Sequence, residues 1–361
     1  MAQSYNFNAG PARLPAEVLE QVREELLDLN GTGLSVLEIS HRSKVYETIH
    51  GETRQLLREL LDIPSDCEVL FLQGGASTQF AMVPLNLLVE GRTAAYVLSG
   101  TWSVKARMEA DKVGDVVVAA SSEADKFRNV PDVRGLSVRP DAAYVHMTTN
   151  ETIAGTQFRE FPDPGGVPLV ADMSSDLLSR TVDMSRFDLV YAGAQKNAGP
   201  SGVTIVIVRN DLLRGIPRTV PDILNYRVHA EHGSLFHTPP VFSIYIVNLV
   251  LKWIRRNGGV VGIERNNRRK AELLYRTVDE SGGFYEGLAG RDSRSMMNVT
   301  FRTPDAERDE LFVKESERHG FVGLKGHRDA GHLRASIYNA VGLEDCLALT
   351  AFMRSFLQRY G

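Results

Sequence analysis

From about residue 69 onward, the sequence alternates between short apolar runs and polar or helix-like stretches, and this pattern limits the folds open to the chain. The apolar runs read EVLFL, AAYVL, DVVVAA, AAYVHM, PLVAD, DLVYAG and VTIVIV. Apolar strands that alternate with crossover segments are typical of a parallel sheet with both faces covered. The sequence therefore predicts an α/β fold built on a mainly parallel sheet.

The pattern changes after Trp253. The later segments predict helix, strand, helix, strand and helix, in the order NNRRKAELLYRTV, MNVTF, RDELFVKESERHG, HLRASIY and LEDCLALTAFMRSFLQ. A chain of 361 residues exceeds the usual size of a single core. We therefore predict a large domain over 1–258 and a smaller C-terminal α+β domain over 259–361, divided at a pair of glycines. Before the sheet, LPAEVLEQVREELLDL predicts a helix that ends ahead of Gly31.

Composition excludes several classes of protein. The formal net charge is −4 and no long basic run is present, so a nucleic-acid partner is not expected. Cys67 and Cys346 lie far apart, which indicates neither a disulfide framework nor a metal site and favours a reducing compartment. The N-terminus does not have the pattern of a leader peptide, and the segment VFSIYIVNLVLKW is too short and too polar to span a bilayer. We expect a cytoplasmic protein without a membrane segment.

Lys196 follows the predicted strand DLVYAG and precedes the turn GPSG. This places it at the carboxyl edge of the sheet, where open α/β sheets bind ligands. A lysine with a lowered pKa could form a Schiff base there. Lysines are also common in solvated loops, and the position alone does not separate the two interpretations.

Asp172 ends the preceding strand, PLVAD. Pyridoxal phosphate (PLP) needs a carboxylate against its pyridine nitrogen, because a protonated ring accepts electrons from the substrate. Asp172 is the candidate for this partner. The alternative is a strand-end carboxylate that caps the following turn.

The stretch LFLQGGAST joins a strand to a helix that is expected to begin near Ala76. Two glycines allow a close backbone approach, and a helix N-terminus presents free N–H groups to an anion, so a phosphate could bind at Ala76 and Ser77. The stretch is neither G-x-G-x-x-G nor a Walker A motif. A tight strand-to-helix turn without a ligand remains the alternative.

Taken together, many ordered motifs make the chain resemble the phosphoserine aminotransferases, class V members of the aspartate-aminotransferase fold (fold type I PLP enzymes). The motifs run from end to end: FNAGPARLP (7–15), SVLEISHRS (35–43), FLQGGAS (71–77), TWS (101–103), TNETIAGTQF (149–158), ADMSSDLLSR (171–180), YAGAQKNAGPSG (191–202), TPP (238–240), GLKGHR (from 323) and LRASIYNA (to 340). The resemblance implies PLP as the cofactor and no metal.

Residue by residue, the resemblance implies these roles at the cofactor. Lys196 forms the Schiff base and Asp172 meets the pyridine nitrogen. Trp102 stacks on the ring, although packing alone could also explain a tryptophan there. Thr152 binds the phenolic oxygen, and the phosphate is held by Ala76, Ser77 and Gln195.

The resemblance also implies a homodimer with shared active sites. The loop FHTPP of one chain, with His237 and Thr238, is expected to complete the phosphate site of the other. His237 stands where the family pattern has Asn, and Ser77 stands where some members have Arg. For the substrate, Arg334 resembles the arginine that binds the α-carboxylate, and the N-terminal segment contributes to the same site. The cluster for the substrate phosphate or side-chain carboxylate is expected to comprise His41, Arg42, His327 and Arg328.

The implied reaction is reversible amino transfer between L-glutamate and 3-phosphohydroxypyruvate, which gives 2-oxoglutarate and O-phospho-L-serine in serine biosynthesis. The sequence leaves open whether the phosphorylated hydroxythreonine of pyridoxine (vitamin B6) biosynthesis is also a substrate. Alternatives are another class V enzyme, such as an alanine-glyoxylate aminotransferase or a cysteine desulfurase, and a PLP-binding protein without turnover. A desulfurase needs a nucleophilic cysteine, and neither cysteine lies in a recognisable catalytic loop.

Overall fold

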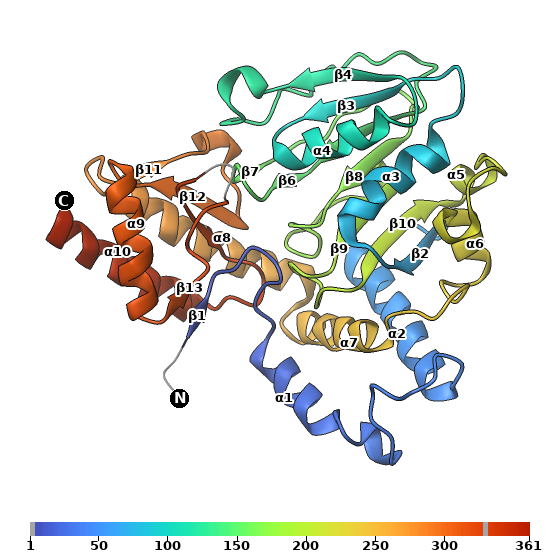
Figure 1. The fold of residues 1–361 in the computed structure, drawn as a ribbon, viewed down its shortest axis with the longest axis horizontal. Coiled ribbons are helices and arrows are strands. Elements are labelled where there is room, and N and C mark those ends of the chain that lie inside the picture. Colours follow the sequence, from blue (N-terminus) through green and yellow to red (C-terminus); the bar gives the residue numbers. More distant parts are fainter. Residues whose placement is uncertain (1–3, 328–330) are drawn as a thin grey trace.

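The computed structural model describes residues 4–327 and 331–361, and its main feature is a large mixed sheet (Figure 1). In the described part of the chain this sheet has seven strands in the order β2-β10-β9-β8-β5-β3-β4. They are β2 (Cys67–Leu72), β3 (Ala94–Leu98), β4 (Val116–Ser121), β5 (Tyr144–Thr148), β8 (Leu169–Asp172), β9 (Leu189–Gly193) and β10 (Thr204–Arg209). Among these strands, β10 runs antiparallel to both of its neighbours, β2 and β9, and the other adjacent pairs are parallel. The predicted α/β class and the mainly parallel sheet are confirmed.

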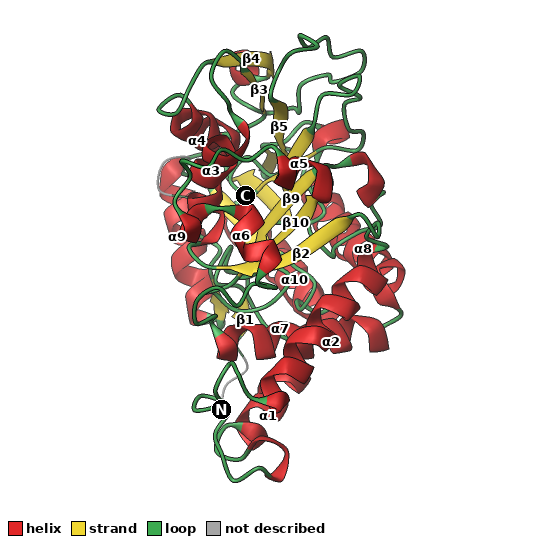
Figure 2. Ribbon diagram, turned by 90° about the vertical axis from the view of Figure 1, so that its right-hand side faces the viewer, coloured by secondary structure: helices red, strands yellow, loops and turns green. Residues whose placement is uncertain are grey.

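Helices cover both faces of this sheet, which explains why its strands are apolar along most of their length (Figure 2). Side chains such as Leu70 and Tyr96 pack on one side, and Val69 and Val97 on the other. The first side is covered by α3 (Gly75–Leu87), α4 (Thr101–Ala110), α5 (Asn210–Arg214) and α6 (Tyr226–Glu231). The second is covered by α1 (Ala16–Glu25), α2 (Lys44–Leu61) and α7 (Val241–Arg256).

The C-terminal part of the chain forms a lobe with its own hydrophobic cluster. Its elements are α8 (Gly259–Asp279), β11 (Glu286–Gly287), β12 (Asn298–Arg302), α9 (Ala306–Arg318), β13 (Phe321–Val322), β14 (Leu333–Ser336) and α10 (Leu343–Tyr360). The N-terminal strand β1 (Tyr5–Asn6) pairs in parallel with β13, and Phe7 is buried in the cluster of this lobe. The domain division at residue 258 stays a prediction; that residue lies between α7 and α8.

Short elements complete the structure: strands β6 (Asn150–Glu151) and β7 (Thr156–Gln157), and 3₁₀ turns over Leu29–Gly31, Glu123–Asp125, Met184–Arg186, Asp222–Leu224 and Arg291–Ser293. Helix α1 ends at Glu25, earlier than its sequence pattern predicts. The reason is local pairing: the Leu29 amide donates to the Leu34 carbonyl, and Asp28 accepts from the Gly33 amide. These bonds compete with further helical turns.

The apolar segment that the sequence analysis judged too short for a bilayer forms most of α7, which packs against α2. In 4–327 and 331–361, no helix has both the length and the apolar character needed to cross a membrane.

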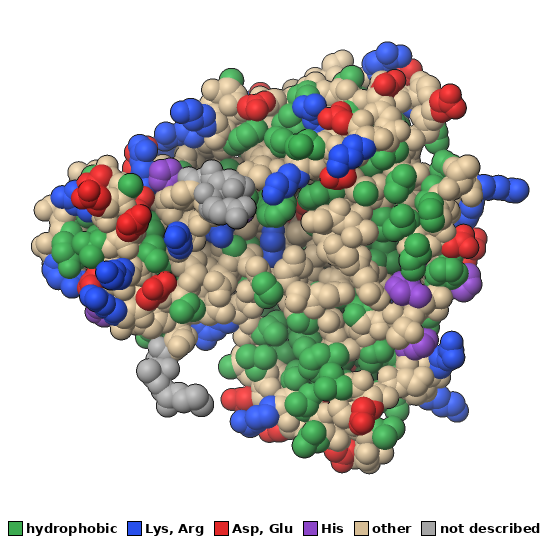
Figure 3. Space-filling view, viewed as in Figure 1, with side chains coloured by type: hydrophobic (Ala, Val, Ile, Leu, Met, Phe, Trp, Pro, Cys, Tyr) green, Lys and Arg blue, Asp and Glu red, His purple; other side chains and the backbone are tan. Residues whose placement is uncertain are grey.

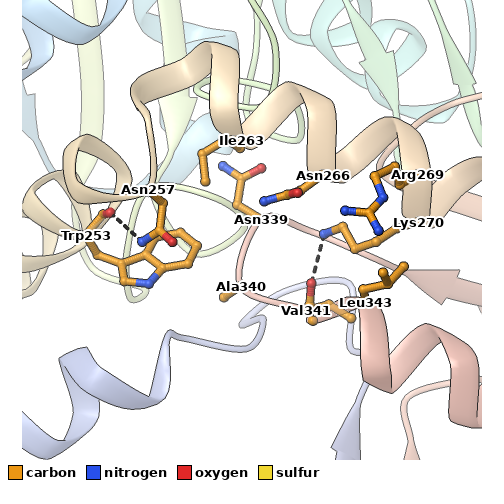
Figure 4. A pocket seen from close by; sticks show the side chains of 11 residues that line it. Trp253, Asn257, Ile263, Asn266, Arg269, Lys270, Asn339, Ala340, Val341 and Leu343 are labelled. Carbon is orange, nitrogen blue, oxygen red and sulfur yellow. Dashed lines mark hydrogen bonds between the residues drawn. The ribbon is translucent and has the colours of Figure 1, made fainter.

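Lys270 of α8 binds the turn between β14 and α10 in the C-terminal lobe. Its side chain is fully buried, and Nζ donates to the carbonyls of Ile337, Tyr338 and Val341 at 3.0, 2.8 and 2.9 Å. Figure 4 shows the lysine beside a cavity of about 200 Å³, pointing towards Val341. One ammonium group therefore satisfies three buried acceptors that the end of β14 leaves open.

We predict that Lys270→Met lowers the free energy of unfolding by roughly 3 kcal/mol or more, because each buried acceptor left without a donor costs about 1–3 kcal/mol. The measurement is the urea unfolding midpoint at fixed protein concentration. Arg269→Met is the matched control, since Arg269 is exposed on the same helix and a surface change should stay within about 0.5 kcal/mol. Equal losses in the two variants would contradict the assigned role of Lys270.

Candidate active site

Lys196, Asp172 and Thr152 meet at the carboxyl edge of the sheet. Asp172 is the last residue of β8, Lys196 follows the end of neighbouring β9, and Thr152 follows β6. The Lys196 Nζ donates to Thr152 Oγ1 at 2.6 Å. The strand-end rule that singled out Lys196 and Asp172 in the sequence thus agrees with their positions.

The electrostatics of this group follow from burial. Asp172 is 4% exposed, and burial raises the pKa of its carboxyl; the positive charge of Lys196 and a 2.8 Å bond from the Ser174 amide oppose the rise. Burial lowers the pKa of Lys196, against the attraction of Asp172 and Glu151. The lysine can therefore lose its proton more easily than a solvated one, as Schiff-base chemistry requires.

Trp102 lies in the first turn of α4, beside the lysine. The Lys196 Nζ is 5.5 Å from the centroid of the indole ring. The indole is half-buried, and its Nε1 is buried with no hydrogen-bond partner among the described residues. A flat aromatic face next to Lys196 is the surface on which a planar cofactor ring can stack.

The turn before α3 is shaped by glycine. Gly74 has φ +90°, and a Cβ there would lie 1.9 Å from Thr78 Oγ1, so a side chain is excluded. The helix starts at Gly75, one residue before the expected position, and Ala76 and Ser77 form its open first turn. Their backbone N–H groups are available for an anion.

Gln195 and the N-terminal segment lie against the lysine turn. The Ala12 amide donates to the Gln195 carbonyl at 2.8 Å. A Cβ on Gly10 would be 3.5 Å from the Cγ atoms of both Gln195 and Lys196, so this glycine packs directly on the turn. The N-terminal segment therefore forms one wall beside Lys196.

Arg334 approaches the same place from the C-terminal lobe. It lies on β14, is 9% exposed, and its Nη1 donates to the Thr152 carbonyl at 3.4 Å. Its Nε is buried without a hydrogen-bond partner in 4–327 and 331–361, and burial lowers the pKa of the guanidinium. A buried arginine with an open donor is suited to binding a carboxylate.

Two other expected substrate residues belong to this lobe. His327 is half-buried, and Arg328 lies outside the described residues.

The remaining expected residues gather elsewhere on the chain. His41 and Thr238 line one cavity of about 430 Å³, whose described lining does not include Lys196. The Gln73 side-chain amide donates to His237 Nε2 and to the Thr238 carbonyl, both at 3.1 Å. Within one chain, these residues therefore lie beside the turn before α3. Arg42 is exposed to solvent.

Glu151 is a buried carboxylate that the sequence analysis did not single out. It is 1% exposed and accepts hydrogen bonds from the first turn of α4. The motif TNETIAG contains it, but nothing local in that motif indicates a partner far along the chain. Burial raises the pKa of Glu151, and the charge of Asp172 adds to this rise. The charge of Glu151 in turn opposes the lowering of the Lys196 pKa by burial.

Known proteins are similar to this chain over nearly its full length. The aminotransferase class-V family model matches residues 4–349. Phosphoserine aminotransferases from Niallia circulans and Bacillus subtilis are 55% and 51% identical to the chain, with 99% of each sequence covered.

Solved structures agree. The phosphoserine aminotransferase from Bacillus circulans subsp. alkalophilus superimposes with a TM-score of 0.98 at 55% identity, over 99% of both chains. A PLP-bound phosphoserine aminotransferase from Trichomonas vaginalis gives 0.90 at 35% identity, with 98% of this chain and 100% of that one covered. An alanine–glyoxylate aminotransferase from Nostoc sp. shares only the fold, at 16% identity and a TM-score of 0.74. The chain belongs to the phosphoserine aminotransferase family, within the class-V aminotransferases.

Proposed function

We propose that the protein transfers an amino group between L-glutamate and 3-phosphohydroxypyruvate, which gives 2-oxoglutarate and O-phospho-L-serine in serine biosynthesis. Its cofactor is pyridoxal phosphate. The observation that carries the proposal is the meeting of Lys196, Asp172 and Thr152 with the buried Arg334 at one sheet edge.

The residues present fit this cofactor. Asp172 provides a buried carboxylate, and Trp102 provides an aromatic face. Lys196 provides an amine of lowered pKa, and α3 provides an open helix N-terminus. When bound, pyridoxal phosphate accepts the electrons released at the substrate α-carbon. Asp172 supplies the negative charge for the pyridine nitrogen, and Thr152 a hydroxyl for the phenolic oxygen. Ala76, Ser77 and Gln195 hold the phosphate.

Lys196 moves the proton. Its lowered pKa lets Nζ act as a base towards the substrate α-carbon and later return a proton as an acid. Thr152 Oγ1, at 2.6 Å, orients Nζ. Arg334 binds the α-carboxylate, while the phosphate of the substrate is held by His41, Arg42, His327 and Arg328.

A cysteine desulfurase reaction does not fit the chain. Cys67 and Cys346 are both buried, and burial raises the pKa of each thiol, to about 12 for Cys346. A nucleophilic thiolate needs the opposite shift and an exposed position.

We predict that the purified protein forms 2-oxoglutarate from glutamate with 3-phosphohydroxypyruvate far faster than with unphosphorylated 2-oxo acids. Lys196→Ala should lose nearly all of this turnover, since no base remains at that position. A coupled assay measures the rates, and borohydride reduction followed by peptide mapping identifies the lysine that holds the cofactor. A labelled lysine other than Lys196 would refute the assignment. Absence of turnover in the parent protein would favour a binding protein instead.

Arg334→Leu should reduce kcat/KM about tenfold to a hundredfold for every amino-acid substrate, because all of them carry the α-carboxylate. Arg42→Leu is the matched control and should impair O-phosphoserine more than an unphosphorylated analogue. The measurement is kcat/KM for both substrates in both variants. A selective loss of O-phosphoserine in Arg334→Leu would move Arg334 to the phosphate.

We also infer a homodimer with shared sites. Apolar side chains are exposed along the N-terminal segment, with Leu19, Leu27, Leu34 and Leu37 between 49% and 81% accessible. Figure 3 shows apolar atoms gathered on the lower part of the molecule, over α1 and α7. Such a patch favours a protein partner. His41 and Thr238 lie near this segment and not in the wall around Lys196, which fits residues that serve a second chain.

Mixing a Lys196→Ala chain with a chain that carries His237→Ala and Thr238→Ala should restore activity, because one hybrid site then contains neither defect. The loop variant alone must first be shown to be impaired. The measurement is turnover after co-refolding, compared with each parent variant. Hybrid dimers without recovery would show that the loop serves its own chain.

The domain division and the cellular location remain proposals. A boundary between 1–258 and 259–361 is supported by the separate hydrophobic cluster of the C-terminal lobe. Two free cysteines support a reducing, cytoplasmic location.

A further inference from the structure

Glu151 is a buried titratable group with no part in the mechanism above. Its Oε2 accepts from the Trp102 amide at 3.1 Å. Its Oε1 accepts from the Ser103 amide at 3.0 Å and from Ser103 Oγ at 2.8 Å. The carboxylate thus binds the open end of α4, although it belongs to β6, far along the chain.

Helix α4 depends on this external partner. Gly100 precedes its first turn and has no side chain to accept from the free backbone amides. Burial raises the pKa of Glu151, and the hydrogen bonds from the Ser103 and Trp102 amides oppose this rise, because each amide donates to a carboxyl oxygen. A negative charge at a helix N-terminus is also favourable to the helix dipole.

The carboxylate leaves no room for a side chain at residue 100. A Cβ on Gly100 would lie 2.5 Å from Glu151 Cδ, so the glycine is required by the contact, not by its extended backbone. Ser103 Oγ accepts from the amides of Ser99 and Gly100 at 2.9 and 3.0 Å. The strand-to-helix turn is closed around the carboxylate from both sides.

We infer that Glu151 is a positioning residue, which fixes the backbone of Trp102 and so holds the indole face next to Lys196. This inference rests on the proposed function, in which that face carries the cofactor ring. The chain of contacts is short: one hydrogen bond joins Glu151 to the Trp102 amide, and the indole centroid lies 5.5 Å from the Lys196 Nζ.

The charge of Glu151 also acts on the lysine. Burial lowers the pKa of Lys196, and the charges of Asp172 and, to a smaller extent, Glu151 oppose this shift. Arg334 lowers the same pKa further, and Asp176 raises it. Glu151 thereby belongs to the set of charges that Lys196 experiences, although no hydrogen bond to the lysine is required.

The test uses the tryptophans, of which the chain has two. In a Trp253→Phe background, Trp102 alone emits. Glu151→Gln should shift the emission maximum and weaken the near-ultraviolet circular dichroism of the cofactor-free protein. The cause is the glutamine amide, which places a donor against the Trp102 or Ser103 amide. Kcat with O-phosphoserine should fall about tenfold, with a smaller change in KM.

Glu264→Gln is the matched control. Glu264 lies on α8 and also accepts a hydrogen bond from a backbone amide, that of Thr181, at 2.9 Å. It should leave the Trp102 signals and kcat unchanged. Unchanged Trp102 signals in Glu151→Gln would overturn the inference, even if its melting temperature falls.

Gly100→Ala covers the case in which Glu151→Gln does not fold. It keeps the charge but pushes a methyl group against the carboxylate, so the same change in the Trp102 signals is expected. Normal Trp102 signals in this variant would overturn the inference. Failure of the proposed function is recognised separately, as missing transaminase activity in the Trp253→Phe parent.

Discussion

The site depends on the opposite charges of Lys196 and Asp172, which lie buried at one edge of the sheet. Burial raises the pKa of Asp172 and lowers the pKa of Lys196, so it favours the neutral form of both side chains. The charge of each residue opposes the shift of the other. Such a pair survives only where the surrounding backbone is rigid and supplies hydrogen bonds. Parallel strands provide that rigidity, because β8 and β9 lie side by side and end at the same edge. Trp102 of α4, Gly10 of the N-terminal segment and Arg334 of the C-terminal lobe all lie close to Lys196.

The sequence predicts the sheet well because its signal is local. Each strand is a short apolar run, and all strands except the edge strand β4 are buried along nearly their whole length, which makes these runs stand out from their neighbours. The end of α1 could not be predicted, because it depends on the pairing of Leu29 with Leu34 in a loop. The pairing of β1 with β13 was equally hidden, since two-residue strands from opposite ends of the chain carry no pattern of their own.

Some residues of the site could likewise be predicted from local sequence, and others could not. Lys196 and Asp172 could be located from strand ends, and Ala76 and Ser77 from the glycine turn before a helix. The roles of the other residues followed from the family resemblance alone. Glu151 was missed because its partners are backbone amides of a helix distant in sequence, and such partners leave no trace in the residue types. His41 and Thr238 could not be placed relative to Lys196, because their expected contacts involve a second chain.

The pairing of β1 with β13 has a consequence for how the protein is made. Phe7 leaves the ribosome long before Phe321, yet its buried position exists only after Phe321 has been synthesised. The segment around Gly10 packs on the lysine turn. It is therefore held in place from its far side only once β13 has been synthesised. A nascent chain can form the large sheet early, but the wall beside Lys196 closes late. An incomplete chain thus has no finished site in which to retain the cofactor.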